Sequence, residues 1–224
     1  MEVLKVFRHE YKYAISYEEM LRLRQKLNEL LEIDRNYNGY LVRSLYFDSI
    51  NDVDYYEKID GLINRKKIRL RIYEPEAKKV KLELKSKYDY HQQKESLLIT
   101  DDEAKKIIKE NYSVLLEHKE PIAVKIYNIL ISNCYKPKVI IEYQRIAYTT
   151  KNGTRITFDY NIKKSNQIDN FFDKDINYLE LTNPQNIVLE VKFDRFLEPY
   201  ISNVLNEYIA RKESISKYVM GRNV

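Results

Sequence analysis

The chain has 224 residues, of which 44% are hydrophobic and 33% are charged, so it can fill the core of one large domain and stay in solution. Its 39 basic and 34 acidic residues leave a formal net charge of +5, which alone indicates an anionic partner only weakly. Because the chain has only four glycines, it lacks GxGxxG, GxxxxGK[ST] and GxSxG motifs, and any phosphate would have to be held by side chains.

Strand-like alternation begins near the N-terminus and recurs along the chain. Apolar and polar residues alternate with a period of two, which is typical of strands with one buried face. This pattern predicts about eight strands, at residues 5–13, 40–48, 64–74, 78–87, 91–99, 138–149, 154–160 and 186–194.

Helices are predicted between these strands from capping signals and apolar stripes. Ser16 and Glu19 form a capping box before a helical stripe that runs from Met20 to Leu31, and Thr100 and Glu103 form a second one. A third helix follows Pro121, and residues 197–219 have a helical pattern. The polar segment 163–177 is the predicted long loop, and no domain boundary is evident, so we expect a single domain over residues 1–224.

The histidine and cysteine residues make several kinds of functional site improbable. The histidines are too far apart for a zinc site or a histidine-based triad, and the lone Cys134 has no intrachain disulfide partner. No segment approaches the roughly 20 apolar residues of a membrane span, and none resembles a signal peptide. We therefore predict a cytoplasmic protein without a membrane segment. The histidines are His9, His91 and His118.

The polar faces of several predicted strands carry an unusual number of basic residues. In "RKKIRLRIYEP" the apolar face is opposed by Arg65, Lys67, Arg69 and Arg71 in a row, and like charges on one face repel each other. Similar faces occur in "FRHEYKY", "KVKLELKSK", "GTRITFDY" and "IVLEVKF". Such faces suggest an anionic ligand that would offset the repulsion.

Two folds account for these faces. An open antiparallel sheet with one solvated face would carry ordinary Lys, Arg and Glu residues that neutralise each other across strands. Alternatively, about eight strands suffice to close a barrel whose interior admits side chains or one small ligand. We expect the second arrangement, an α+β protein with a closed antiparallel β-barrel, or tunnel, that has a charged interior and is covered by helices. Its interior would bind polyanions such as triphosphate, with glutamate holding a divalent metal.

Nine short segments, which follow one another along nearly the whole chain, resemble the motifs of a known family. They are "RHEYKY", "YFDS", "DYYEKIDG", "KIRLRIY", "LELKSK", "YQRIAY", "RITFD", "LEVKF" and "SISKY". Together they resemble the VTC (vacuolar transporter chaperone) polyphosphate polymerase domain of the triphosphate tunnel metalloenzyme superfamily, which is CYTH-like. The resemblance implies a tunnel whose basic residues bind the phosphates of a nucleotide and of a growing chain.

The resemblance implies a role for individual residues. Arg69, Arg71, Arg145 and Arg155 would clamp the phosphates of ATP, and Glu190 with Glu10 would bind Mn²⁺ or Mg²⁺, with Glu83 a lesser candidate. Lys94 matches a further basic position, although "HQQKES" lacks the arginine that often follows it. The full set of implied catalytic residues is Lys12, Arg69, Arg71, Lys85, Lys94, Arg145, Arg155, Lys192 and Lys217.

The first strand departs from the hydrolytic members of the superfamily. Those members begin with ExExK, whereas this chain has Arg8-His9-Glu10-Tyr11-Lys12. Hydrolysis benefits from an activated water, but chain extension uses a terminal phosphate oxygen that is already an anion. We therefore expect a polymerase that acts on ATP and inorganic polyphosphate. The alternatives are a metal-dependent triphosphate hydrolase and a non-catalytic polyphosphate-binding module, and no nucleic-acid partner is expected, because the basic residues are borne by strands.

Overall fold

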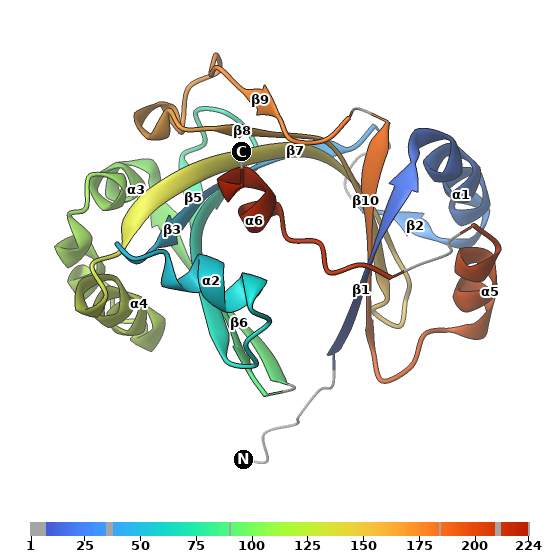
Figure 1. Cartoon of the computed structure of the whole chain (residues 1–224), viewed down its shortest axis with the longest axis horizontal. Helices are drawn as coiled ribbons and strands as arrows, with labels where there is room; N and C mark the ends of the chain where they lie inside the picture. The colour runs from blue at the N-terminus through green and yellow to red at the C-terminus, as the bar shows by residue number, and fades with distance from the viewer. Residues whose placement is uncertain (1–7, 35–37, 90, 184, 209–211, 224) are drawn as a thin grey trace. The chain divides into compact units, whose positions relative to one another are not determined.

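The computed structural model describes residues 8–34, 38–89, 91–183, 185–208 and 212–223. These residues form an α+β fold with a ten-stranded sheet in the order β1-β10-β8-β7-β3-β4-β5-β6, with β2 beside β7 and β9 beside β8 (Figure 1). Strand β10 pairs antiparallel with β1 and β8, and β3, β4, β5 and β6 pair antiparallel in that order, as predicted. No ladder among the described residues joins β1 to β6, so the closure of the barrel stays a prediction.

The predicted strands are present with shifted ends, and β8 runs five residues beyond the predicted end, so residues 163–165 of the predicted loop are strand. The strands are β1 (Arg8–Ser16), β3 (Tyr40–Asp48), β4 (Arg65–Ile72), β5 (Lys79–Tyr88), β6 (His91–Thr100), β7 (Lys136–Thr149), β8 (Arg155–Ser165) and β10 (Asn186–Asp194). Residues 5–7 of the first predicted strand lie outside the described residues. The sequence pattern missed β2 (Glu32–Ile33) and β9 (Leu179–Glu180), because two residues are too few to show alternation.

The chain divides into two compact units, and each combines segments that are distant in sequence. Unit 1 comprises residues 1–41, 143–162 and 182–216, and unit 2 comprises residues 42–142, 163–181 and 217–224. Each unit has its own hydrophobic cluster of buried residues. The single domain that the sequence suggested stays a prediction.

Unit 1 is built on the long β1–β10 ladder. Ile15, Leu189 and Val191 point into its core, where α1 (Tyr17–Leu30) packs on both strands. The Ser16 side chain accepts a hydrogen bond from the Glu19 backbone N–H, which confirms the predicted capping box. Helix α5 (Pro199–Tyr208) packs against α1 (Figure 1). The polar faces of the strands are thereby left on the side away from this core.

The predicted helix over residues 197–219 is wrong in its middle. The structure has α5 and then α6 (Lys217–Arg222), while residues 212–216 have no helix. The reason is a competing interaction with the edge strand β1, because the Glu213 backbone N–H donates to the Lys12 carbonyl and Lys12 Nζ donates to the Ile215 carbonyl. These bonds hold the segment against β1 without a helix.

Unit 2 contains β4, β5 and β6 together with helices that cover their apolar face. Ile68, Leu70 and Leu84 are fully buried in the cluster that these strands share with α3 (Asp101–Ile108) and α4 (Pro121–Ser132). The 3-10 helix η1 (Tyr112–Glu117) connects these helices, and a second one, η2 (Ile168–Asn170), follows β8 within the predicted loop. The alternation in "RKKIRLRIYEP" therefore identified the buried face correctly.

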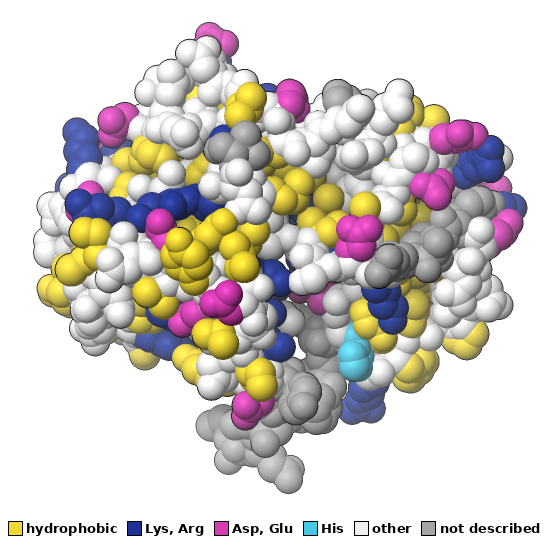
Figure 2. Space-filling model, viewed as in Figure 1, with side chains coloured by type: hydrophobic (Ala, Val, Ile, Leu, Met, Phe, Trp, Pro, Cys, Tyr) yellow, Lys and Arg dark blue, Asp and Glu magenta, His cyan; other side chains and the backbone are white. Residues whose placement is uncertain are grey.

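Helix α2 (Val53–Ile59) of unit 2 was not predicted from the sequence. It contacts β4 and α6, and Asp54 points inward, where it accepts a hydrogen bond from Tyr135 Oη at 2.7 Å. Its outer face and the following turn leave apolar side chains exposed, including Tyr56, Ile59 and Ile63 (Figure 2). In the described part of the chain, no helix is both long and apolar enough to cross a membrane.

Gly39 provides a test of the packing behind the candidate site. Its φ is +84°, and a Cβ atom there would lie 2.7 Å from the Arg145 carbonyl oxygen, which is backbone and cannot rotate away. We expect Gly39→Ala to lower the free energy of unfolding by about 2–4 kcal/mol, from backbone strain and this contact together. Gly153→Ala is the matched control, because Gly153 has a φ of +87° and nothing within 4 Å. Urea unfolding of both variants should show the larger loss for Gly39→Ala, and equal losses would contradict the contact.

Candidate functional site

In unit 1, charged side chains gather on the strand faces that lie opposite the hydrophobic core. Ile156 and Phe158 of β8 belong to the core, so the alternating residues of that strand point the other way. The same alternation holds in β1 and β10, whose apolar residues also belong to the core. We call this set the Glu190 cluster, and it consists of Glu10, Lys12, Arg145, Arg155, Thr157, Asp159, Glu190 and Lys192.

The β1–β10 ladder sets two carboxylates against two ammonium groups. Glu10 lies opposite Lys192, and Lys12 lies opposite Glu190. Lys12 Nζ is 3.0 Å from Glu10 Oε1 and 3.9 Å from Glu190 Oε2, and Lys192 forms an ion pair with the other oxygen of Glu190. This alternation of charge fixes the side chains of all four residues on one face.

Arg145 is held by a carboxylate that the sequence did not single out. Its Nε and Nη2 atoms donate to the two oxygens of Asp159 at 2.6 and 2.7 Å, and Asp159 is fully buried. Burial alone would lower the pKa of Arg145, but Asp159 and Tyr143 raise it above its ordinary value. The guanidinium is therefore a permanent positive charge in a fixed orientation.

Arg155 lies at the start of β8 and is less enclosed. Its Nη2 atom donates to Asp34 Oδ2 at 2.6 Å and to Tyr40 Oη at 3.0 Å. Lys192 lies opposite it on β10. The structure thus places Arg155 and Lys192 next to each other, and their phosphate-binding role stays a prediction.

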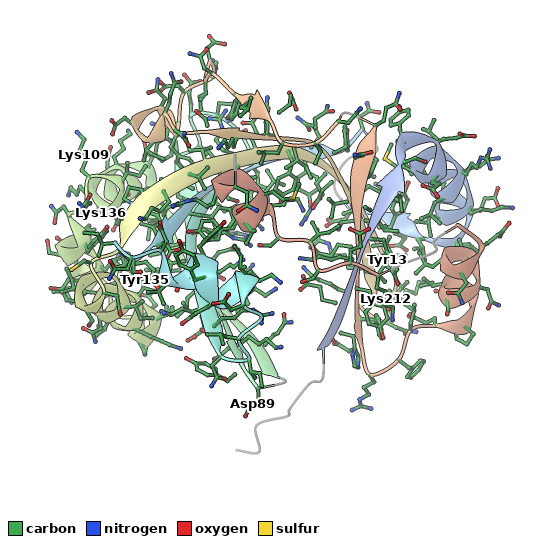
Figure 3. The ribbon with its side chains drawn as sticks, viewed as in Figure 1. Tyr13, Asp89, Lys109, Tyr135, Lys136 and Lys212 are labelled. Carbon is green, nitrogen blue, oxygen red and sulfur yellow. The ribbon has the colours of Figure 1, made fainter. Side chains whose placement is uncertain are left out.

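The C-terminal segment 212–216 lies along β1 beside this cluster. Besides the backbone bond to Lys12, Lys212 reaches back to the strand (Figure 3), where its ammonium nitrogen is 3.3 Å from the centre of the Tyr11 ring. The carbonyl of Ile215 accepts from Lys12 Nζ at 3.1 Å. This segment therefore helps to orient the Lys12 ammonium group.

Unit 2 carries a second group of charged side chains around one buried carboxylate. Glu83 is only 1% exposed, and it contacts Arg69 Nε at 2.7 Å, Lys94 Nζ at 2.5 Å and Arg71 Nη1 at 3.8 Å. Lys85 lies opposite Lys94 on β6. We call this set the Glu83 cluster, and it consists of Tyr46, Arg69, Arg71, Glu83, Lys85, Lys94 and Lys217.

The electrostatics of the Glu83 cluster are dominated by its cations. Burial alone would raise the pKa of the Glu83 carboxyl, but Arg69, Arg71 and Lys94 lower it far below its usual range. Glu83 therefore stays ionised at neutral pH and acts as a counter-ion. Because one carboxylate faces several basic side chains, the cluster keeps a net positive charge.

Tyr46 links the arginines of β4 to helix α6. Its hydroxyl accepts a hydrogen bond from Arg69 Nη1 at 3.0 Å, and its ring stacks on that of Tyr218 at 5.2 Å. Burial would raise the pKa of the Tyr46 phenol, yet Arg69, Arg71 and Lys217 lower it below its usual value. Arg69, Arg71 and Lys217 therefore all act on the Tyr46 phenol, and the role of Lys217 in the set stays a prediction.

Helix α6, which carries Lys217, is fixed by contacts of the residues that follow it. The Tyr218 hydroxyl donates to Asp48, and Arg222 Nη2 donates to Asp52 Oδ2 at 2.7 Å. Gly221 allows a close approach to β7, because a Cβ atom there would lie 2.3 Å from Ile141 Cδ1. Lys217 is consequently only 9% exposed and has a defined position.

The Glu190 cluster offers two carboxylates, Glu10 and Glu190, to a divalent metal. Among the described residues, no three His, Cys, Asp or Glu side chains gather to form a protein-only metal site. Glu10 and Glu190 nevertheless both approach Lys12, at 3.0 and 3.9 Å. One or two carboxylates completed by water and substrate phosphates are the usual ligands of Mg²⁺, so these residues fit a metal that binds together with its phosphate ligand.

Comparison with known proteins supports the fold. The sequence matches the VTC domain family over residues 7–224. An adenylate cyclase-like protein from Bacillus halodurans is similar in structure, with a TM-score of 0.55 and 16% identity over 92% of this chain and 95% of that one. An adenylyl cyclase-like protein from Hippeastrum, described as having a dominant triphosphatase activity, has a TM-score of 0.58 and 15% identity over 96% and 94%. No curated protein matches the sequence.

Proposed function

The chain belongs to the VTC domain family, and on this premise we propose that it is a polyphosphate polymerase. In the proposed reaction a terminal oxygen of inorganic polyphosphate attacks the γ-phosphorus of ATP. The bond from the γ-phosphorus to the β–γ bridging oxygen breaks, ADP leaves and the chain is one phosphate longer. A fold-level relationship to triphosphate-handling proteins and the strand-borne basic residues support a function in triphosphate or polyphosphate chemistry.

The observation that carries the proposal is that buried carboxylates hold arginines in place before any ligand is bound. Asp159 holds Arg145, and Glu83 holds Arg69. Phosphoryl transfer needs positioning and electrostatic stabilisation more than covalent help from the protein. Guanidinium groups whose orientation is already fixed lose little rotamer entropy when they bind phosphate, so these arginines suit that task.

Both clusters have a part in the proposed reaction. The guanidinium groups of Arg69, Arg71, Arg145 and Arg155 clamp phosphates. Lys12, Lys85, Lys94, Lys192 and Lys217 neutralise charge that develops during transfer. Glu190 and Glu10 would hold Mn²⁺ or Mg²⁺, and that ion would add positive charge next to the phosphate oxygens.

Hydrolysis of triphosphate is the second candidate. It is favoured by the triphosphatase activity described for the Hippeastrum protein, which has the same fold. It is disfavoured by the first strand, where Arg8 occupies the position of the first glutamate of ExExK. A third possibility is a module that binds polyphosphate without turning it over.

The product formed from ATP distinguishes these functions. We expect incubation with γ-labelled ATP and Mn²⁺ or Mg²⁺ to give acid-insoluble labelled polymer together with ADP. Orthophosphate in a stoichiometric amount and no polymer would overturn the polymerase in favour of the hydrolase. Tight tripolyphosphate binding measured by calorimetry without turnover of ATP or tripolyphosphate would identify a binding module. The same incubation with a metal chelator is the control for metal dependence.

A further inference from the structure

Thr157 has a buried hydroxyl group that the protein itself does not satisfy. The residue is 3% exposed, and its Oγ1 atom is buried without a hydrogen-bond partner in the part of the chain that the structure describes. Buried polar groups are nearly always hydrogen-bonded, because an unpaired one loses its bonds to water and gains none. An unpaired hydroxyl at this position therefore indicates a missing partner.

The neighbours of Thr157 indicate the chemistry of that partner. Thr157 lies opposite Glu190 on β10, and on β8 it lies between Arg155 and Asp159, the residue that holds Arg145. Ile156 and Phe158 point into the hydrophobic core, so the hydroxyl is on the charged side of the strand. The partner is therefore a polar group that binds next to the Arg155 guanidinium, and the two neighbouring carboxylates are already paired with Lys12, Lys192 and Arg145.

Arg155 supplies an independent observation at the adjacent position. Its Nε atom is also buried and lacks a hydrogen-bond partner within the described residues, although its Nη2 atom is bound to Asp34 and Tyr40. Arg155 and Thr157 are two residues apart in one strand, so their side chains share a face about 7 Å apart. The Arg155 Nε–H requires an acceptor and the Thr157 hydroxyl can donate to one, and a phosphate group has several acceptor oxygens.

We propose that the Thr157 hydroxyl donates a hydrogen bond to an oxygen of a bound phosphate group, which Arg155 contacts at the same time. This makes Thr157 a further binding residue for the anion, and the inference rests on the proposed function of the Glu190 cluster. The hydroxyl adds a neutral donor between charged groups, so it selects for an oxygen acceptor in a fixed position and adds no further charge.

Two substitutions separate this role from a structural one. Thr157→Val removes the hydroxyl and keeps the branched shape, and Thr157→Ser keeps the hydroxyl. Calorimetry with tripolyphosphate in metal-free buffer should show an affinity about 10- to 100-fold weaker for Thr157→Val and within about threefold of wild type for Thr157→Ser. The melting temperature of unliganded Thr157→Val should equal or exceed that of wild type, because an unpaired buried donor has been removed.

Thr182→Val is the matched control. Thr182 also belongs to unit 1 and has a buried Oγ1 without a partner among the described residues, but it precedes β10 and lies outside the Glu190 cluster. We expect Thr182→Val to leave tripolyphosphate affinity unchanged. An equal loss of affinity in both variants would show a general effect of the substitution and overturn the role of Thr157.

The remaining outcomes distinguish this inference from the proposed function. If wild type binds tripolyphosphate and Thr157→Val binds it equally well, the inference is wrong and the proposed function stands. If Thr157→Val loses affinity only when Mn²⁺ is present, the hydroxyl serves a metal ion and the phosphate contact is overturned. If wild type does not bind tripolyphosphate, the proposed function itself fails. An unliganded Thr157→Val that melts well below wild type would show that the hydroxyl is structural.

Discussion

Glu83→Gln is expected to lower the free energy of unfolding by about 3 kcal/mol or more at neutral pH. The substitution leaves Arg69, Arg71 and Lys94 without the carboxylate that they share in the interior of unit 2. Removing one member of a buried ionic network is strongly destabilising, because the buried Arg71 and the partly buried Arg69 have already lost much of their hydration, whereas Lys94 remains half exposed. Urea unfolding of wild type and variant at pH 7 measures this difference.

The difference in free energy of unfolding between wild type and Glu83→Gln should fall as the pH is lowered. The pKa of Glu83 is lower in the folded protein than in the unfolded chain, where it is about 4.3. Its contribution is therefore present above about pH 4.3 and is lost progressively as the pH falls through the lower folded pKa. We expect the stability difference between wild type and Glu83→Gln to be constant from pH 7 to about pH 5 and to shrink below about pH 4.

Glu142→Gln is a matched control for the ligand effect. Glu142 is 4% exposed in the same unit, and it binds Arg43, Lys163 and Tyr178 outside the Glu83 cluster. Tripolyphosphate should restore much of the stability of Glu83→Gln, because its charge replaces the lost carboxylate, and should not preferentially restore Glu142→Gln. Equal restoration of both variants, or a Glu83→Gln variant as stable as wild type, would contradict the account of Glu83 as the counter-ion of a phosphate site.

Most of the long elements could be predicted because their signals are local. Alternation identified the strands that contribute to both cores, and the capping boxes at Ser16 and Thr100 are present with both hydrogen bonds. Helix α2 could not be predicted in this way. Its N-cap residue, Asp52, makes no side-chain cap, and the backbone N–H groups of Asp54 and Tyr55 are instead bound by Asp48 from the end of β3.

The basic residues of the candidate site could be predicted, but their counter-ions could not. Alternation places Arg69 and Glu83 on polar faces, yet only the register of β4 and β5 sets them opposite each other. The same holds for the pairing of Arg145 with Asp159. The sequence therefore suggested rows of mutually repelling cations, whereas the structure has buried carboxylates that hold them. A ligand is still favoured at the Glu83 cluster, because Arg69, Arg71 and Lys94 share a single carboxylate there. In the Glu190 cluster the cations are matched by Glu10, Asp34, Asp159 and Glu190.

Substitution of Glu190, the proposed metal ligand, should have the largest effect on ATP turnover. Glu190 is 6% exposed and pairs with Lys12 and Lys192. We expect Glu190→Gln to lower metal-dependent turnover of ATP by about 100-fold or more, because it removes the better-buried of the two carboxylates proposed to hold the metal. Binding of tripolyphosphate without metal should be as tight as in wild type or tighter, because a negative charge next to the bound anion has been removed.

Glu198→Gln distinguishes this effect from a general loss of structure. Glu198 is 7% exposed in the same unit and accepts hydrogen bonds from the hydroxyl groups of Thr150 and Thr154, contacts that the Gln oxygen can in part retain. Its variant should keep wild-type turnover. Steady-state rates at increasing Mn²⁺ or Mg²⁺, measured together with calorimetric tripolyphosphate binding, test the assignment. If Glu190→Gln reaches the wild-type rate at saturating metal, Glu190 is not the essential ligand. If turnover and metal-free binding fall together, Glu190 organises the anion site and does not act through a metal.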